Sequence, residues 1–336
     1  MEALDAAREI YDHGKHVILS TEGRKEPVSL RSLATSVKRQ IVPSFAKFET
    51  YFSSSSGSNY ADGLIVNQFN NHGSFIGTQE QYTAIIVNTL QYQVMYMAIL
   101  QNLHQAIADC ESSNRAQIIQ ARTHWDTAAA LITGSMQKSK ANQNDGYLLY
   151  GLALDLCSDF NKCDGEEATI NLKILDAMYS GSFLLEQRTC SAVEKIARNV
   201  EKQLLVPLIQ GTLKTAYTNS QFGDARQEET LASGYVYSRA ILPFIHDVNP
   251  KAAQVINKNM DFQFGEVAVV DGYAKVFDEI SNSVDKMGIN CKDIGYMNDA
   301  KRGICNLKST SGGNTWNVSI LLSAVVIITS FTILLF

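Results

Sequence analysis

The stretch "QYTAIIVNTLQYQVMYMAILQNLHQAI", residues 81–107, decides the fold. At 3.6 residues per turn it carries two neighbouring apolar faces. One face holds Ile86, Leu90, Met97 and Leu100, and the other holds Tyr92, Tyr96, Ile99 and Leu103. A helix that is apolar around so much of its circumference has to be buried by other helices. The stretch therefore predicts an all-α protein built as a multi-helix bundle.

Helical periodicity continues on both sides of this segment. The further helices are expected over 28–52, 115–136, 166–187, 190–218, 228–246 and 264–286. "GSMQKSKANQNDG" (134–146) and "CSDFNKCDGEE" (157–167) are expected to be loops because of their Ser, Asn, Gly and Asp content. No stretch alternates strongly enough to predict a sheet.

Composition and motifs exclude several classes of function. The net charge is −5 and no long Lys/Arg block occurs, so nucleic acid is not an expected partner. The chain contains no HExxH, GxSxG, P-loop or GxGxxG motif, and none of its six histidines begins an HxxE. The expectation is a binding protein and not an enzyme.

Six cysteines allow about 15 disulfide connectivities. The shortest local pairings are Cys157 with Cys163 and Cys291 with Cys305, which leaves Cys110 with Cys190. No CxxC pair occurs, so a zinc site is disfavoured. Three disulfides are expected, and buried thiols of a cytosolic protein are the alternative.

The C-terminal residues 318–336 carry no charge and are long enough to span a bilayer. The small residues before them fit a GPI-attachment signal, with Ser309 and Ser311 as candidate lipid-attachment residues. The spacer is shorter than the usual ~8–12 residues, and a retained membrane span is the alternative. The first residues lack the basic and apolar regions of a signal peptide. We therefore expect a signal peptide upstream of this sequence, with a tail-anchored cytosolic protein as the alternative.

A weak internal repeat suggests how the chain is organised. Residues 36–52 resemble 199–217, which places Val42-Pro43 over Val206-Pro207. Residues 97–104 resemble 239–246, which places His104 over His246. Chance similarity between amphipathic helices is the alternative. The expected divisions are a first helical repeat over 1–110, a second helical half over 111–300, a Ser/Gly spacer over 301–317 and the hydrophobic tail over 318–336.

"SGYVYSRAILPFIHDVN", residues 233–249, holds the main candidate site. On a helix, Tyr235, Arg239 and His246 share one face, while Tyr237 points elsewhere. An arginine suits carboxylate or carbonate, and phenolate, imidazole and carboxylate groups such as that of Asp247 can bind ferric iron. The alternative is ordinary packing with a salt-bridged arginine. The first repeat has glutamine and methionine where Tyr235 and Arg239 stand, so only the second half carries the full set.

Two further clusters hold candidate ligands. "THWDTAAALITGS" (123–135) contains Asp126, and "NDGYLLYGLALDLCSDF" (144–160) contains Tyr147. A helix start and a turn are the simpler interpretations of these two stretches. The candidate metal ligands are thus Tyr235, Tyr237, His246, Asp247, Asp126 and Tyr147, with Arg239 as the anion-binding residue.

Several ordered motifs carry a resemblance to a known family. "HWDTAAALITGS", "DGYLLYGLALDLCSDFNKC", "VPLIQGTLKTAYTNS" and "ASGYVYSRAILPFIHDVNP" resemble the algal Fe-assimilation family, which includes high-carbon-dioxide-inducible periplasmic proteins and phytotransferrins. The resemblance is strongest between Ala121 and Asp261. It implies a secreted or surface-bound all-helical protein that captures ferric iron, with carbonate as a candidate synergistic anion.

The resemblance also implies a location and partners. The expected location is the outer face of the plasma membrane or the periplasmic space, reached through the secretory pathway, and a surface reductase or permease is a candidate partner. A structural or adhesive helical surface protein without a metal site is the alternative. An imelysin-like peptidase is disfavoured by the missing HxxE.

Overall fold

The structure, a computed structural model, describes residues 2–15, 18–21, 24–52, 60–70, 77–134, 137, 146–222, 228–261 and 268–305. The protein is an all-α helical bundle, as predicted, with three small two-stranded hairpins among the described residues. The hydrophobic tail, Ser309 and Ser311 lie outside the described residues. The membrane and lipid-attachment predictions therefore stay predictions.

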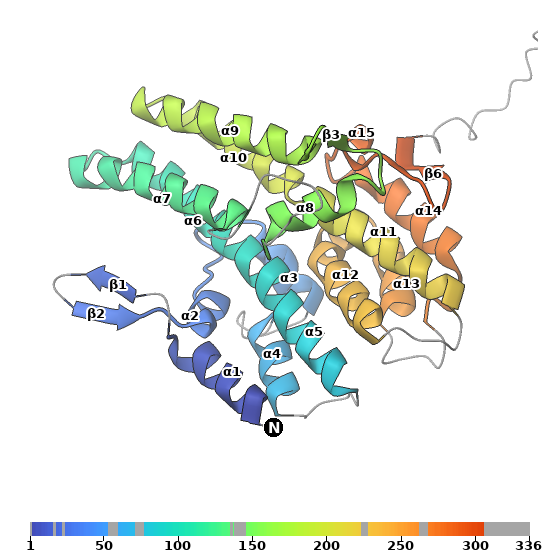
Figure 1. Ribbon diagram of the computed structural model, residues 1–336. Coiled ribbons are helices and arrows are strands. Elements are labelled where there is room, and N and C mark those ends of the chain that lie inside the picture. Colours follow the sequence, from blue (N-terminus) through green and yellow to red (C-terminus); the bar gives the residue numbers. More distant parts are fainter. Residues whose placement is uncertain are drawn as a thin grey trace, which may run out of the picture.

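The elements follow one another in two groups (Figure 1). The first consists of α1 (Glu2–His13), β1 (Ile18–Thr21), β2 (Arg24–Pro27), α2 (Leu30–Thr35), α3 (Phe45–Phe52), α4 (Asp62–Phe69), α5 (Gln79–Thr89), the π-helical turn η1 (Leu90–Val94), α6 (Met95–Glu111) and α7 (Arg115–Thr133). The second consists of α8 (Leu149–Cys157), β3 (Cys163–Asp164), β4 (Glu167–Ala168), α9 (Thr169–Glu186), α10 (Cys190–Gln203), α11 (Leu205–Phe222), α12 (Glu228–Val248), α13 (Pro250–Met260), α14 (Tyr273–Val284), α15 (Cys291–Ile294), β5 (Tyr296–Met297) and β6 (Arg302–Gly303).

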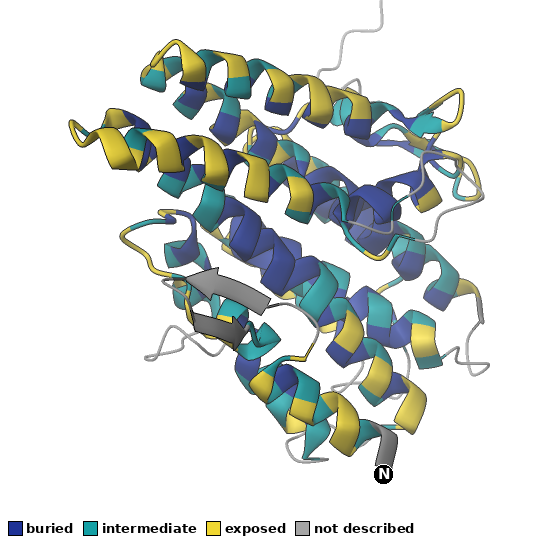
Figure 2. Ribbon diagram, turned by 60° about the vertical axis from the view of Figure 1, so that its left-hand side comes forward, coloured by how far each residue is buried: buried dark blue, intermediate teal, exposed yellow. Residues whose placement is uncertain are grey.

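The helical run α5–η1–α6 forms the centre of the bundle, as its two apolar faces predict. Of the eight apolar side chains on those faces, all but Leu90 are buried. Thr78 and Gln81 begin the run with a reciprocal capping box. The run is long and apolar enough to cross a membrane by length and composition, but 67% of its apolar window is buried inside the protein. Figure 2 shows this buried band crossing the middle of the molecule, which identifies it as a core helix.

Two helical hairpins, α6/α7 and α9/α10, lie side by side and extend from the bundle (Figure 1). A disulfide between Cys110, near the end of α6, and Cys190, at the start of α10, joins them. The Trp125 ring packs against Gly181, and its Nε1 donates a hydrogen bond to the Met178 carbonyl at 2.8 Å. The small residues that follow Trp125 in sequence therefore serve close packing between α7 and α9.

The helix α12 lies on the other side of the central run and packs against α3, α5, α11 and α13. Gly234 makes this contact close, because a Cβ there would come within 2.8 Å of Thr215 Oγ1 and 2.9 Å of Met260 Cε. The helix continues through Pro243 and ends at Val248, where Asn249 caps the next helix and Pro250 begins it.

Three predicted helices differ from the structure in their bounds. The segment 28–52 is two helices, α2 and α3, and Pro43 lies in the connection between them. The segment 190–218 divides at Leu204, since Pro207 has no N–H for a helical hydrogen bond to Gln203. The described part of the predicted 264–286 helix begins only at Tyr273, after Gly272 with φ of +85°. The helices α8 and α13 were missed, the first because its residues were interpreted as a ligand-bearing turn.

The three disulfides have the pairings that spacing favoured. Cys157 pairs with Cys163 and Cys291 with Cys305, across Cα–Cα distances of 4.9 and 5.3 Å. The Cys110–Cys190 pair closes the longest loop, with a sequence separation of 80. No cysteine remains free.

Candidate functional site

Two residues of the predicted site, Tyr235 and Arg239, meet on one face of α12. Arg239 Nη1 lies 3.4 Å from Tyr235 Oη, and its guanidinium carbon lies 4.2 Å from the centroid of the Phe52 ring and 5.4 Å from that of the Tyr235 ring. The guanidinium thus packs against aromatic side chains from two helices. Its Nε is buried and has no hydrogen-bond partner within the described part of the chain. A buried donor without a partner is costly unless a ligand satisfies it.

Tyr51 from α3 and Asp261 at the end of α13 complete this cluster. Tyr235 is 5% exposed and Asp261 is 8% exposed. Burial raises the pKa of Tyr51 to about 12, with Arg239 opposing the shift and Asp261 and Tyr235 adding to it. Burial likewise raises the pKa of Tyr235, against Arg239 and with Asp261. Each phenol therefore senses both the guanidinium and the carboxylate. We call Tyr51, Tyr235, Arg239 and Asp261 the phenol–arginine cluster.

His246 and Asp247 lie further along α12. His246 is eleven residues from Tyr235, which is about 16 Å along a helix axis. Its ring packs edge-on against the Tyr51 ring, with centroids 5.4 Å apart. Asp247 is exposed and its Oδ2 pairs with Lys47 Nζ at 2.7 Å. The 4, 3 and 4 spacing places these side chains on one face, as predicted, but three helical turns separate the histidine from the first phenol.

Tyr237 faces the opposite side of α12. Its ring lies 5.3 Å from the Tyr92 ring, and it packs over Gly211, where a Cβ would come 2.8 Å from its Cδ2. Burial raises the pKa of Tyr237 to about 12, while a hydrogen bond with Tyr92 opposes the shift. Tyr237 is therefore not brought to the phenol–arginine cluster.

The other two predicted ligands lie on different elements. Asp126 is exposed on α7, with its carboxylate 3.8 Å from Arg122 of the preceding turn. Tyr147 precedes α8 and is 61% exposed. Neither side chain belongs to the phenol–arginine cluster.

Sequence reasoning missed Tyr51 and Asp261 as members of the site. They are 184 and 26 residues from Tyr235 in the chain, and only the packing of α3 and α13 against α12 brings them near it. No group of three His, Cys, Asp or Glu side chains that could hold a metal occurs among the described residues. The phenol–arginine cluster has a single carboxylate, so its metal chemistry would depend on its two phenols.

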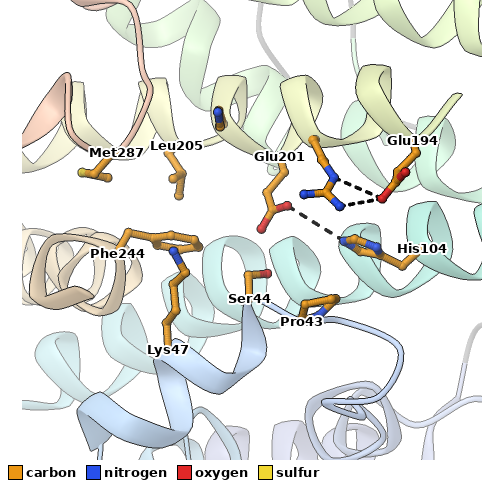
Figure 3. Close-up of a pocket in the computed structure, with 11 residues that line it drawn as sticks. Pro43, Ser44, Lys47, His104, Glu194, Glu201, Leu205, Phe244 and Met287 are labelled. Carbon is orange, nitrogen blue, oxygen red and sulfur yellow. Dashed lines mark hydrogen bonds and ion pairs between the residues drawn. The ribbon is translucent and has the colours of Figure 1, made fainter. Parts of the chain in front are cut away.

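A second candidate site is a cavity of about 380 Å³ between α3, α6, α10, α11 and α12 (Figure 3). It is lined by Pro43, Ser44, Lys47, His104, Glu194, Arg198, Glu201, Lys202, Leu205, Phe244 and Met287. Glu194, Arg198 and Glu201 recur at spacings of four and three on α10, which places them on one face of that helix. The repeat singled out His104, but its carboxylate neighbour on α10 was not foreseen.

The Glu201 carboxylate is the most buried charge in this cavity. Its Oε2 lies 3.9 Å from His104 Nε2, and the two side chains are only 15% and 17% exposed. Burial acts to raise the pKa of Glu201, but the interactions with His104, the Ser44 hydroxyl and Lys47 outweigh it and lower that pKa. Glu201 is therefore an ionised carboxylate in a mostly enclosed position.

Comparisons with models of known protein families, with curated proteins and with solved structures return no match to this chain.

Proposed function

We propose that this chain binds ferric iron at the phenol–arginine cluster, as a non-enzymatic protein of iron uptake. The observation that carries the proposal is the buried Arg239 Nε without a partner, next to two buried phenols and a buried carboxylate. A guanidinium with a free N–H edge suits a small planar oxyanion, and carbonate is the candidate.

Charge supports ferric iron as the cargo. Two phenolates and one carboxylate supply three negative charges, which balance the three positive charges of Fe³⁺. Hard oxygen donors suit this cation, while the cluster offers no thiolate. Carbonate held by Arg239 would occupy further coordination positions and exclude water.

Protons compete with the metal at these phenols. Since the pKa of Tyr51 is about 12 and that of Tyr235 is raised as well, both are protonated at neutral pH in the free protein. Iron has to displace these protons, so its affinity falls as the pH falls. Acidification, through protonation of the phenols and the carbonate, would release the iron. His246 beside Tyr51 is a candidate to assist this release below neutral pH.

The compartment follows from the cysteines and the sequence motifs. Three disulfides favour an oxidising compartment, such as the cell surface or the periplasmic space. The motif resemblance to the algal Fe-assimilation family is consistent with this location. The hydrophobic tail would attach the protein to the membrane as a lipid-anchor signal or a span. A surface reductase or permease would take the released iron.

Ferric titration tests the proposal. The purified full chain in detergent is titrated with ferric citrate, with and without bicarbonate, and the visible spectrum is recorded. Phenolate ligands predict a saturable charge-transfer band that requires bicarbonate. A chain without any saturable band would contradict the proposal and favour the structural or adhesive surface protein.

A further inference from the structure

The cavity between α3, α6, α10, α11 and α12 has the features of a site for a small charged molecule. Its volume of about 380 Å³ exceeds that of a single ordered water severalfold. Charged side chains line one part of it and apolar side chains line another. The iron-binding proposal makes no use of this cavity.

The Glu201 carboxylate has acceptor capacity that its neighbours leave unfilled. A carboxylate can accept about four hydrogen bonds. Its charged partner in the described part of the chain, His104, lies at the long distance of 3.9 Å. Such a buried anion is stabilised further by a ligand that donates N–H groups to it. Arg198 is already held by Glu194 through contacts of 2.5 and 3.2 Å, and Lys47 by Asp247 at 2.7 Å.

Ser44 provides a second, independent observation. It is 8% exposed, lines the cavity, and its hydroxyl has no hydrogen-bond partner of normal geometry within the described residues. Figure 3 shows Ser44 and Glu201 facing one another across the cavity. An orphaned hydroxyl beside an under-satisfied carboxylate marks a position for a polar ligand group.

The opposite charge and the apolar wall define the rest of the ligand. Lys202 lines the cavity and forms no ion pair with any described residue. Its ammonium lies near Gly288, where an added Cβ would come within 2.7 Å of Nζ. Phe244, Leu205 and Met287 form the apolar side, which Figure 3 shows on the far side of Glu201 from His104.

We propose that this cavity binds a small zwitterion, an α-amino acid with an apolar side chain. Its ammonium group donates to Glu201 and to the Ser44 hydroxyl. Its carboxylate pairs with Lys202, and its side chain packs on Phe244 and Met287. An organic anion alone would leave Glu201 unsatisfied, and an organic cation alone would lie beside Lys202 without a counter-charge.

Calorimetric titration of the full chain in detergent tests this assignment. The probes are L-methionine, 4-(methylthio)butanoate, which lacks the ammonium group, and 3-(methylthio)propylamine, which lacks the carboxylate. We expect saturable binding of L-methionine and binding at least about tenfold weaker for each analogue, because each loses a charge-assisted pair. Absence of methionine binding, or equal binding of either analogue, would overturn the assignment.

Variants separate this site from its surroundings. Glu201→Gln and Lys202→Gln should each weaken methionine binding about tenfold or more. Glu194→Gln, on the same face of α10 but paired with Arg198, is the matched control and should leave binding within about twofold. Because Glu201 is buried, its variant needs a circular-dichroism check, whereas the exposed Lys202 tests the assignment without a load on the fold. Unchanged binding in Lys202→Gln would contradict the proposed carboxylate contact.

Discussion

The guanidinium of Arg239 lies 4.2 Å from the centroid of the Phe52 ring. Contact with the aromatic ring fixes the position of the flat cation, and its edge N–H groups remain available for an oxyanion. The buried Nε without a partner is one of these groups. The arrangement therefore depends on a planar, forked cation and not merely on a positive charge.

Replacement of Arg239 should abolish the bicarbonate-dependent ferric band. Arg239→Lys keeps the charge but loses the fork, so we expect it to weaken iron binding about tenfold or more, and Arg239→Ala to weaken it further. Met97→Ala is the control at the equivalent position of the first repeat. Ferric titration in bicarbonate measures all three, and equal losses in Arg239→Ala and Met97→Ala would contradict the placement of the site.

The two tyrosines of α12 should differ in their effect on the iron spectrum. Tyr235→Phe removes a proposed ligand, so the intensity of the charge-transfer band should fall by about half if two phenolates contribute equally. Tyr237→Phe changes a ring packed against Tyr92 on the other side of the helix and should leave the band intact. Both side chains are largely buried, which makes the pair a matched comparison. A Tyr237 effect as large as that of Tyr235 would refute the assignment.

The raised pKa of Tyr51 predicts how stability changes in alkali. Burial moves the pKa from 10.0 to about 12 in the folded protein. Between these values the unfolded chain loses a proton that the folded chain keeps, so the free energy of unfolding falls as the pH rises. Tyr51→Phe should make this fall less steep. Urea unfolding at several pH values between 10 and 12 measures the slope, and an identical slope in the variant would argue against a buried, protonated Tyr51.

The all-α class and the disulfide pairings could be predicted because they depend on local signals. The apolar faces of 81–107 reveal burial, and short sequence separation favours Cys157 with Cys163. The phenol–arginine cluster could be predicted only in part, since periodicity relates Tyr235 to Arg239 but not to Tyr51 on another helix. The charged cavity escaped prediction for the same reason. On α10 alone, the Glu194 and Arg198 pattern looks like any solvated helix face.

The contact between Trp125 and Gly181 should reverse the usual effect of alanine in a helix. Alanine is normally about 1 kcal/mol better than glycine inside a helix. Here a Cβ would overlap the Trp125 ring, so we expect Gly181→Ala to destabilise the fold by about 1–3 kcal/mol. Ser182→Ala on the same helix is the control. Denaturant unfolding reports both, and a stabilised Gly181→Ala variant would contradict the packing between α7 and α9.

The Cys110–Cys190 disulfide should contribute more stability than the Cys157–Cys163 disulfide. The loop-closure model predicts about 4–5 kcal/mol for a sequence separation of 80 and about 2 kcal/mol for a separation of 6. Cys110 and Cys190 also hold the ends of two extended helical hairpins together, so their replacement should loosen α9 and α10 relative to α6 and α7. The two double-serine variants are compared by denaturant unfolding and by hydrogen exchange. Faster exchange confined to these hairpins is expected for the Cys110/Cys190 variant, whereas a larger loss of stability in the Cys157/Cys163 variant would contradict the entropic account.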